Sequence, residues 1–168
     1  MESRRGDHIL VYVASGFDAL LAQLKQHAQE SFLVYGYDRS EQDSVLTYKP
    51  FSRHGFLEDL ATAKAVIATA GFTLISEAMS LRKPYLALPM KGQFEQQLNG
   101  YLLEKMGYGK NVREIDDDVI GEFLYDIPRY DQRFQDYQST DNQAIQEKLD
   151  ELLENDAILA KDFQANRT

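Results

Sequence analysis

Residues 65–89 have the sequence AVIATAGFTLISEAMSLRKPYLALP, in which two short apolar runs flank a segment long enough for a helix. The first run, Ala65–Thr69, ends in a turn at Thr69-Ala70-Gly71, and the second, Pro84–Pro89, has a proline at each end. Short apolar runs bounded by turn residues favour buried strands, and the segment between them, Phe72–Leu81, favours a helix. The stretch therefore predicts one strand–helix–strand unit.

The same alternation of strands and helices extends to both sides of this unit. Because nearly continuous apolar runs indicate parallel strands that are buried on both faces, the predicted fold class is α/β, a Rossmann-like parallel sheet with helices on both faces. Further strands are predicted at His8–Ala14, Ser31–Gly36, Ser44–Tyr48 and Gly109–Val112, and further helices at Phe17–Leu24, Phe56–Ala63, Gln93–Met106, Val119–Tyr125 and Asn142–Leu153.

Length and charge divide the chain into three expected parts. The 168 residues suit about one domain, and 43% hydrophobic residues are enough to fill its core. Residues 114–168 hold 15 of the 27 acidic residues and 5 of the 18 basic ones. We expect residues 1–7 to form a linker or end segment, residues 8–126 to form the Rossmann-like domain, and residues 127–168 to form an acidic helical extension.

Composition also limits the classes of function. A formal net charge of −9 argues against nucleic-acid binding, which needs clustered basic residues. The absence of cysteine excludes disulfides and thiolate chemistry. The sequence shows no apolar run long enough to span a membrane and no signal-peptide pattern, so a cytoplasmic location is expected.

Three predicted strand ends carry turn residues and lie at one edge of the sheet. They are Ala14-Ser15-Gly16, Thr69-Ala70-Gly71 and Pro89-Met90-Lys91-Gly92. In doubly wound sheets, ligands bind beyond the carboxyl ends of the strands, and helix N-termini there attract phosphate. Glu77, in the helix that follows Gly71, could accept hydrogen bonds from a ribose diol. Alternatively, it complements the helix dipole.

The helix that begins near Gln93 offers a second set of polar side chains. Glu95, Gln96 and Asn99 share one side of it and could bind sugar hydroxyls, although polar residues open many surface helices. Its buried stripe is predicted to consist of Phe94, Leu98, Tyr101 and Leu102.

Two weaker patterns leave other ligands open. Asp38 lies about 20 residues after Ser15-Gly16, as the acidic residue of a dinucleotide site would, but the turn has one glycine where that fingerprint has three. Asp116–Asp118 could bind a metal, but the pattern fits an acidic helix N-terminus better, and the three histidines lack metal-ligand spacing.

Residues 69–99 resemble the donor-binding half of GT-B glycosyltransferases, especially the group related to MurG and to the UDP-glycosyltransferases. The shared order is a glycine turn, a threonine, a glutamate before a small residue, Lys-Pro at a strand start, proline at its end, and acid-Gln-x-x-Asn. It occurs here as Gly71, Thr73, Glu77-Ala78, Lys83-Pro84, Pro89 and Glu95-Gln96-Gln97-Leu98-Asn99. The resemblance extends more loosely over residues 8–112. It implies the fold of the C-terminal GT-B half, of the glycosyltransferase family 28 type.

The resemblance also implies where each part of a nucleotide-sugar donor would bind. The base would lie against the segment that contains Phe51, Phe56 and Leu57, and the ribose would bind Glu77. The diphosphate would bind Ser15, Gly16, Gly71, Phe72 and Thr73, and the sugar would bind Gln93, Glu95, Gln96 and Asn99. No catalytic residue or metal site is identified, and no cofactor is expected besides the UDP-sugar substrate.

The implied function is hexosyl transfer from a nucleotide sugar, with a UDP-sugar expected, to an unknown acceptor. GT-B enzymes bind the acceptor with an N-terminal domain, so the present domain alone is expected to be inactive and to need that domain in cis or in trans. Any peripheral association with a membrane would be through that other domain. Three alternatives stay open: a non-catalytic donor-binding subunit with a separate acceptor-binding partner, a UDP-N-acetylglucosamine epimerase-like domain, and a dinucleotide-binding domain.

Overall fold

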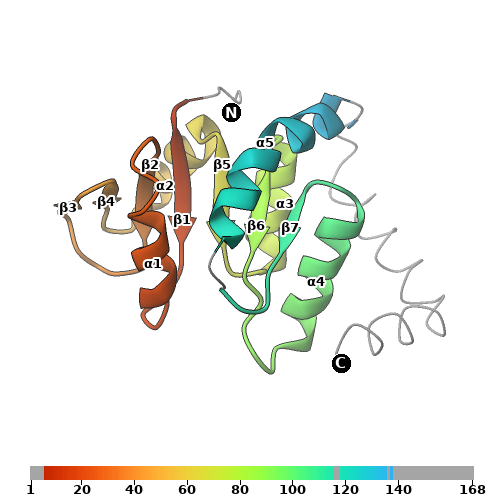
Figure 1. The fold of residues 1–168 in the computed structure, drawn as a ribbon, viewed down its shortest axis with the longest axis horizontal. Coiled ribbons are helices and arrows are strands. Elements are labelled where there is room, and N and C mark those ends of the chain that lie inside the picture. The colour runs from red at the N-terminus through yellow and green to blue at the C-terminus, as the bar shows by residue number, and fades with distance from the viewer. Residues whose placement is uncertain (1–5, 116–117, 136, 138–168) are drawn as a thin grey trace. The chain divides into compact units, whose positions relative to one another are not determined.

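The computed structural model describes residues 6–115, 118–135 and 137, which form a sheet between two layers of helices (Figure 1). Its strands are β1 (His8–Tyr12), β2 (Ser31–Tyr35), β3 (Gln42–Asp43), β4 (Leu46–Tyr48), β5 (Ala65–Ala68), β6 (Tyr85–Ala87) and β7 (Gly109–Asn111). Its helices are α1 (Asp18–Leu24), α2 (Arg53–Thr62), α3 (Phe72–Ser80), α4 (Phe94–Lys105) and α5 (Val119–Gln135).

The sheet has the order β3-β4-β2-β1-β5-β6-β7, and every neighbouring pair is parallel except β3 with β4. From β1 the chain proceeds first to β2 on one side, and it later returns to β5 on the other side. The strand order therefore reverses between β1 and β5, where Tyr12 is the register partner of Ala68. In open α/β sheets, this reversal creates a crevice at the carboxyl ends of the strands.

The helices cover both faces of the sheet. Alternate residues of β1, including Ile9 and Val11, join one buried cluster with apolar residues of α1 and α5, such as Leu20 and Phe123. Figure 1 shows α1 and α5 in front of the sheet and α2 and α3 behind it. Helix α4 packs behind β6. A Cβ on Gly100 of α4 would contact the side chain of Ala87, and Ala87 points to the back of the sheet because the adjacent residue of the strand belongs to the front cluster. The predicted fold class is thus confirmed.

Several predicted boundaries differ from the structure by one or more residues, and three of these differences have a clear local reason. The strand expected from Ser44 starts at Leu46, because Ser44 takes a left-handed φ of 59° in the turn after the unexpected short strand β3. Helix α2 begins at Arg53 instead of Phe56, because the hydroxyl of Ser52 caps it by accepting from the N–H of Gly55 at 3.2 Å.

Helix α5 continues to Gln135 and does not end at Tyr125. Pro128 lies inside it, where proline normally weakens a helix by removing a hydrogen bond. The apolar stripe nevertheless continues through Ile127, Tyr130 and Phe134, which are all at least 96% buried, and their packing outweighs the lost bond. The helix expected at residues 142–153 lies outside the described residues.

Candidate functional site

Three loops at the carboxyl edge expose backbone to open space. Gly16 follows β1, Gly71 follows β5 and Gly92 follows β6, and a Cβ built on any of them would have no atom within 4 Å. Gly36, by contrast, is packed so closely that its Cβ would collide with the carbonyl of Val13. The open glycines therefore leave room beside the backbone for a bound group.

The helices that begin at these loops leave their N-terminal N–H groups without side-chain caps. No side-chain cap occurs on α1, α3 or α4, whereas α2 is capped by Ser52. The first N–H groups of a helix have no intrahelical partner, and they lie at the positive end of the helix dipole. Helix α3 begins at the strand-order reversal, so its N-terminus is the best placed of the three to bind an anion.

Most predicted contacts of the diphosphate and ribose lie along this edge. Ser15 and Gly16 are exposed in the β1–α1 loop. At the start of α3, Phe72 is half-buried and Thr73 is exposed. Glu77 is half-buried in the second turn of α3, and its carboxylate forms no ion pair within the described part of the chain. The structure thus places the predicted anion-binding loops and the predicted ribose ligand on neighbouring strands and one helix.

The β6–α4 loop and helix α4 carry the residues predicted to contact a sugar, and two of them, Gln93 and Gln96, bind each other. The side-chain oxygen of Gln96 accepts from the N–H of Met90 at 3.0 Å, and its amide nitrogen donates to the side chain of Gln93 at 2.6 Å. Glu95 is exposed on the first turn of α4.

Asn99 lies deeper than the other predicted sugar contacts. It is 7% exposed, and its amide nitrogen donates to the carbonyl of Ala70 at 3.1 Å. The expected buried stripe of α4 was wrong at Phe94, which is 62% exposed, and Leu98 and Tyr101 are only half-buried, so Leu102 alone of the four is buried. The buried residues of this helix are Asn99, Gly100, Leu102 and Leu103, because Gly100 packs closely against Asn111 of β7 and Ala87 of β6 and so turns the face with Asn99 inward.

An aromatic cluster lies where the base was predicted to bind. Phe51 is 58% exposed, and its ring stacks at 6.1 Å on that of Tyr12, the last residue of β1. Beneath them, Phe56 contacts Tyr12 and Tyr35 at ring distances of 5.2 and 5.1 Å, while Leu57 is half-buried. Neither Tyr12 nor Tyr35 is among the residues that the sequence predicts to contact the base. The feature of the sequence that could have identified them is an aromatic residue at the carboxyl end of each of two neighbouring strands.

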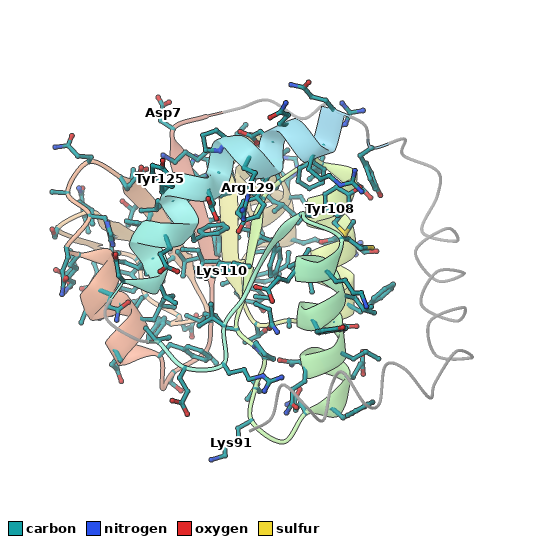
Figure 2. The ribbon with its side chains drawn as sticks, turned by 45° about the vertical axis from the view of Figure 1, so that its right-hand side comes forward. Asp7, Lys91, Tyr108, Lys110, Tyr125 and Arg129 are labelled. Carbon is teal, nitrogen blue, oxygen red and sulfur yellow. The ribbon has the colours of Figure 1, made fainter. Side chains whose placement is uncertain are left out.

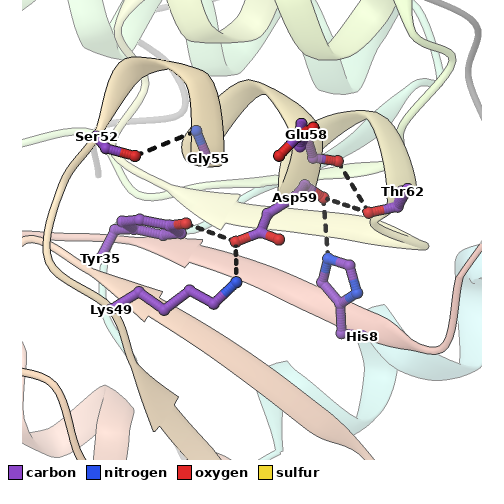
Figure 3. Close-up of polar contacts among 8 residues, drawn as sticks. All are labelled: His8, Tyr35, Lys49, Ser52, Gly55, Glu58, Asp59 and Thr62. Carbon is purple, nitrogen blue, oxygen red and sulfur yellow. Dashed lines mark hydrogen bonds and ion pairs between the residues drawn. The ribbon is translucent and has the colours of Figure 1, made fainter.

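Asp59 of α2 connects this cluster to three strands or strand ends (Figure 3). Its carboxylate accepts from the hydroxyl of Tyr35 at 2.5 Å and from the ammonium of Lys49 at 2.6 Å, and its carbonyl lies 2.9 Å from a ring nitrogen of His8. Burial, together with the Asp59 carboxylate, raises the pKa of the Tyr35 hydroxyl above its ordinary value. The network fixes α2, and with it the loop that presents Phe51.

A pocket of about 610 Å³ lies at the other end of the sheet, between β7, the end of α4 and α5. Figure 2 shows Lys110, Arg129 and Tyr108 on this side of the molecule, apart from Lys91 on the β6–α4 loop. Arg129 pairs with Asp126, and Lys110 pairs with Glu122. This pocket therefore presents a mixed, internally paired surface and is separate from the carboxyl edge.

The described residues offer no metal site or membrane span. No group of three or more His, Cys, Asp or Glu side chains gathers there in a way that could hold a metal ion. Of the predicted Asp116–Asp118 pattern, only Asp118 is described, and its carbonyl accepts from the N–H of Glu122 at the start of α5. Within residues 6–115, 118–135 and 137, no helix is long and apolar enough to cross a membrane.

The parallel sheet, its strand-order reversal and the open loops at that reversal define a doubly wound nucleotide-binding class of fold. The particular family follows from comparison of the sequence. The chain belongs to glycosyl transferase family 1, whose model matches residues 1–128. A protein of Methanosarcina acetivorans named uncharacterized glycosyltransferase is 39% identical over 59 residues, which cover 33% of this chain and 16% of that relative.

Solved glycosyltransferase structures share the fold at low sequence identity. The chain is similar to SsfS6 from Streptomyces sp. SF2575, a complex with thymidine diphosphate, with 17% identity and a TM-score of 0.59 over 80% of this chain. It is also similar to Os79 from O. sativa in complex with UDP, with 15% identity and a TM-score of 0.56 over 79% of this chain. The chain spans about 37% of the length of each of these two structures.

Proposed function

We propose that this chain binds the nucleoside diphosphate of a sugar donor, with a UDP-sugar expected, and that it supplies the donor half of a hexosyltransferase. The observation that carries the proposal is the uncapped N-terminus of α3, which begins beside the open backbone at Gly71. The loop after β1, with Gly16, adjoins it because Tyr12 and Ala68 are register partners. Family membership and the nucleotide complexes of SsfS6 and Os79 support this proposal.

The proposed chemistry is stabilisation of a departing diphosphate. Negative charge develops on the diphosphate as the bond from the sugar breaks, and fixed N–H groups with a helix dipole favour that charge without reorganising. Glu77, one turn further along α3, accepts hydrogen bonds from the ribose in this proposal. Phe51 and Tyr12 offer a flat aromatic surface to the base.

A second, acceptor-binding domain, in cis or in trans, is part of the proposal. Within the described residues, five large hydrophobic side chains are exposed, and four of them belong to segments at the carboxyl edge: Tyr12, Phe51, Met90 and Phe94. Grouped exposed apolar side chains mark binding surfaces. The donor and the acceptor-binding domain would cover them.

Titration calorimetry of the 168-residue chain against UDP, TDP, GDP, ADP and NAD tests the proposed function. We expect UDP to bind most tightly. Tighter binding of NAD would favour a dinucleotide site at Ser15, Gly16 and Asp38, and the absence of binding to any of the five compounds would contradict the proposal.

A further inference from the structure

Four consecutive carbonyls in the β5–α3 turn all accept hydrogen bonds from within the protein. The carbonyl of Ala68 accepts from the N–H of Leu88 at 2.9 Å, and that of Gly71 accepts from the N–H of Ile75 at 3.1 Å. Between them, Thr69 and Ala70 have no backbone partner for their carbonyls in a strand or helix. Side chains supply the missing donors.

Tyr85 and Asn99 are those two donors. The hydroxyl of Tyr85, on the neighbouring strand β6, donates to the carbonyl of Thr69 at 2.7 Å. The amide of Asn99, on α4, donates to the carbonyl of Ala70 at 3.1 Å. Tyr85 is 0% exposed and Asn99 is 7% exposed, so both donor residues are buried behind the turn.

These bonds determine which side of the turn faces a ligand. A carbonyl oxygen turned towards a diphosphate would repel it, whereas an N–H would attract it. With every carbonyl from residue 68 to residue 71 held by an internal donor, the turn presents none of them to the crevice beside Gly71. The first N–H groups of α3 remain without intrahelical partners.

We propose that Tyr85 and Asn99 are positioning residues for the donor diphosphate: they hold the carbonyls of the β5–α3 turn inward so that its N–H groups meet the phosphates. This inference rests on the proposed function. The hydroxyl of Tyr85 has no exposed surface with which to touch a donor, so its effect on binding passes through the turn. Asn99 takes this role in addition to, or in place of, the sugar contact that the sequence predicts.

The inference is tested by comparing UDP with uridine on the whole chain, with dissociation constants from NMR titration. Tyr85→Phe removes only the hydroxyl, and Asn99→Asp replaces the donor amide with a carboxylate of the same shape. Because UDP carries no sugar, a sugar contact of Asn99 does not enter the measurement. The ratio of the uridine constant to the UDP constant reports the contribution of the phosphates.

We expect that ratio to fall about 2- to 10-fold in Tyr85→Phe, the range of one hydrogen bond, and further in Asn99→Asp, with uridine binding little changed. Faster hydrogen exchange of the amides at residues 70–74 should accompany the change. Tyr130→Phe, which alters a buried tyrosine at the other end of the sheet, should leave the ratio unchanged.

The outcomes separate the two proposals. If the wild-type chain binds UDP and both variants keep the wild-type ratio, the positioning role is overturned while the proposed function stands. If Tyr85→Phe weakens UDP and uridine equally, its effect is on general stability, and the positioning role is again overturned. If the wild-type chain binds neither UDP nor uridine, both proposals fail.

Discussion

The phenolic oxygen of Tyr35 lies 2.5 Å from a carboxylate oxygen of Asp59, and this contact joins strand β2 to helix α2 (Figure 3). The two residues are 24 positions apart in the chain. Lys49, which follows β4, binds the same carboxylate oxygen at 2.6 Å. One side chain of α2 thereby fixes two neighbouring strands beneath the loop that carries Phe51.

Asp59→Ala should lower the free energy of unfolding by about 1–3 kcal/mol, because it leaves the partly buried hydroxyl of Tyr35 without its acceptor. The ion pair with Lys49 adds little, since the Lys49 side chain is 40% exposed. Urea denaturation measures the change. Glu58→Ala, at the exposed neighbouring position on α2, is the matched control and should change stability by less than about 0.5 kcal/mol. Equal losses in the two variants would contradict the role of Asp59.

Stability should fall above pH 10, and Tyr35→Phe should make that fall less steep. Folding raises the pKa of Tyr35 above its ordinary value of 10.0, through burial first and through Asp59 second. A raised folded pKa means that the stabilisation is fully present below pH 10 and is lost as the unfolded chain ionises above it. Denaturant midpoints measured between pH 8 and 11 check this. Parallel curves for the wild type and the variant would exclude Tyr35 as a contributor.

Glu77→Ala should weaken UDP binding by about 10- to 150-fold, the range for losing a hydrogen bond to a charged group. Glu77→Gln should retain part of the affinity, because an amide oxygen still accepts one hydrogen bond. Calorimetry with UDP and with 2′,3′-dideoxy-UDP provides the readout, since the second ligand lacks the ribose diol. A Glu77→Ala protein that is folded and loses the same factor for both ligands would disprove the ribose contact.

Phe51→Ala should weaken UDP binding by about 2- to 10-fold if its exposed ring stacks on the base, because ring stacking contributes about 0.5–1.5 kcal/mol. Inorganic pyrophosphate should bind the variant and the wild type equally. Tyr125→Ala removes another exposed aromatic side chain, from α5, and should have no effect on either ligand. A loss of pyrophosphate affinity in Phe51→Ala would instead indicate that the loop has moved.

Local patterns were sufficient to predict the sheet and the edge where ligands are proposed to bind. Short apolar runs indicate buried strands, and the turns at Gly16 and Gly71 indicate where the chain reverses; both signals depend only on a few neighbouring residues. They could not reveal the contacts of Asp59 or Asn99, whose partners lie between 10 and 51 positions away. The orientation of such polar side chains depends on which elements the fold brings together, and no periodicity encodes that.

The same limit explains two of the errors made for the helices. The helix predicted to end at Tyr125 continues to Gln135, because the packing of Phe134 and its neighbours outweighs the effect of Pro128. Phe94 fitted the apolar stripe of α4, yet the helix instead packs Gly100 against Asn111 of β7 and Ala87 of β6, where the absence of a side chain allows a close approach. In both cases tertiary packing overrode a local pattern.

Gly71→Ala offers a way to block the proposed phosphate site without disturbing the fold. Gly71 has φ −70° and ψ 132°, which any residue adopts, and open space lies where the methyl group would be. The free energy of unfolding should therefore change by less than about 0.5 kcal/mol or rise slightly. The methyl group would occupy part of the space proposed for the diphosphate, so UDP affinity should fall while uridine affinity stays near that of the wild type.

Gly36→Ala is the opposite control. Gly36 has a φ of 101° and lies against the carbonyl of Val13, so this change should destabilise the fold by more than about 1 kcal/mol. If Gly71→Ala binds UDP as tightly as the wild type, the diphosphate does not lie beside this turn.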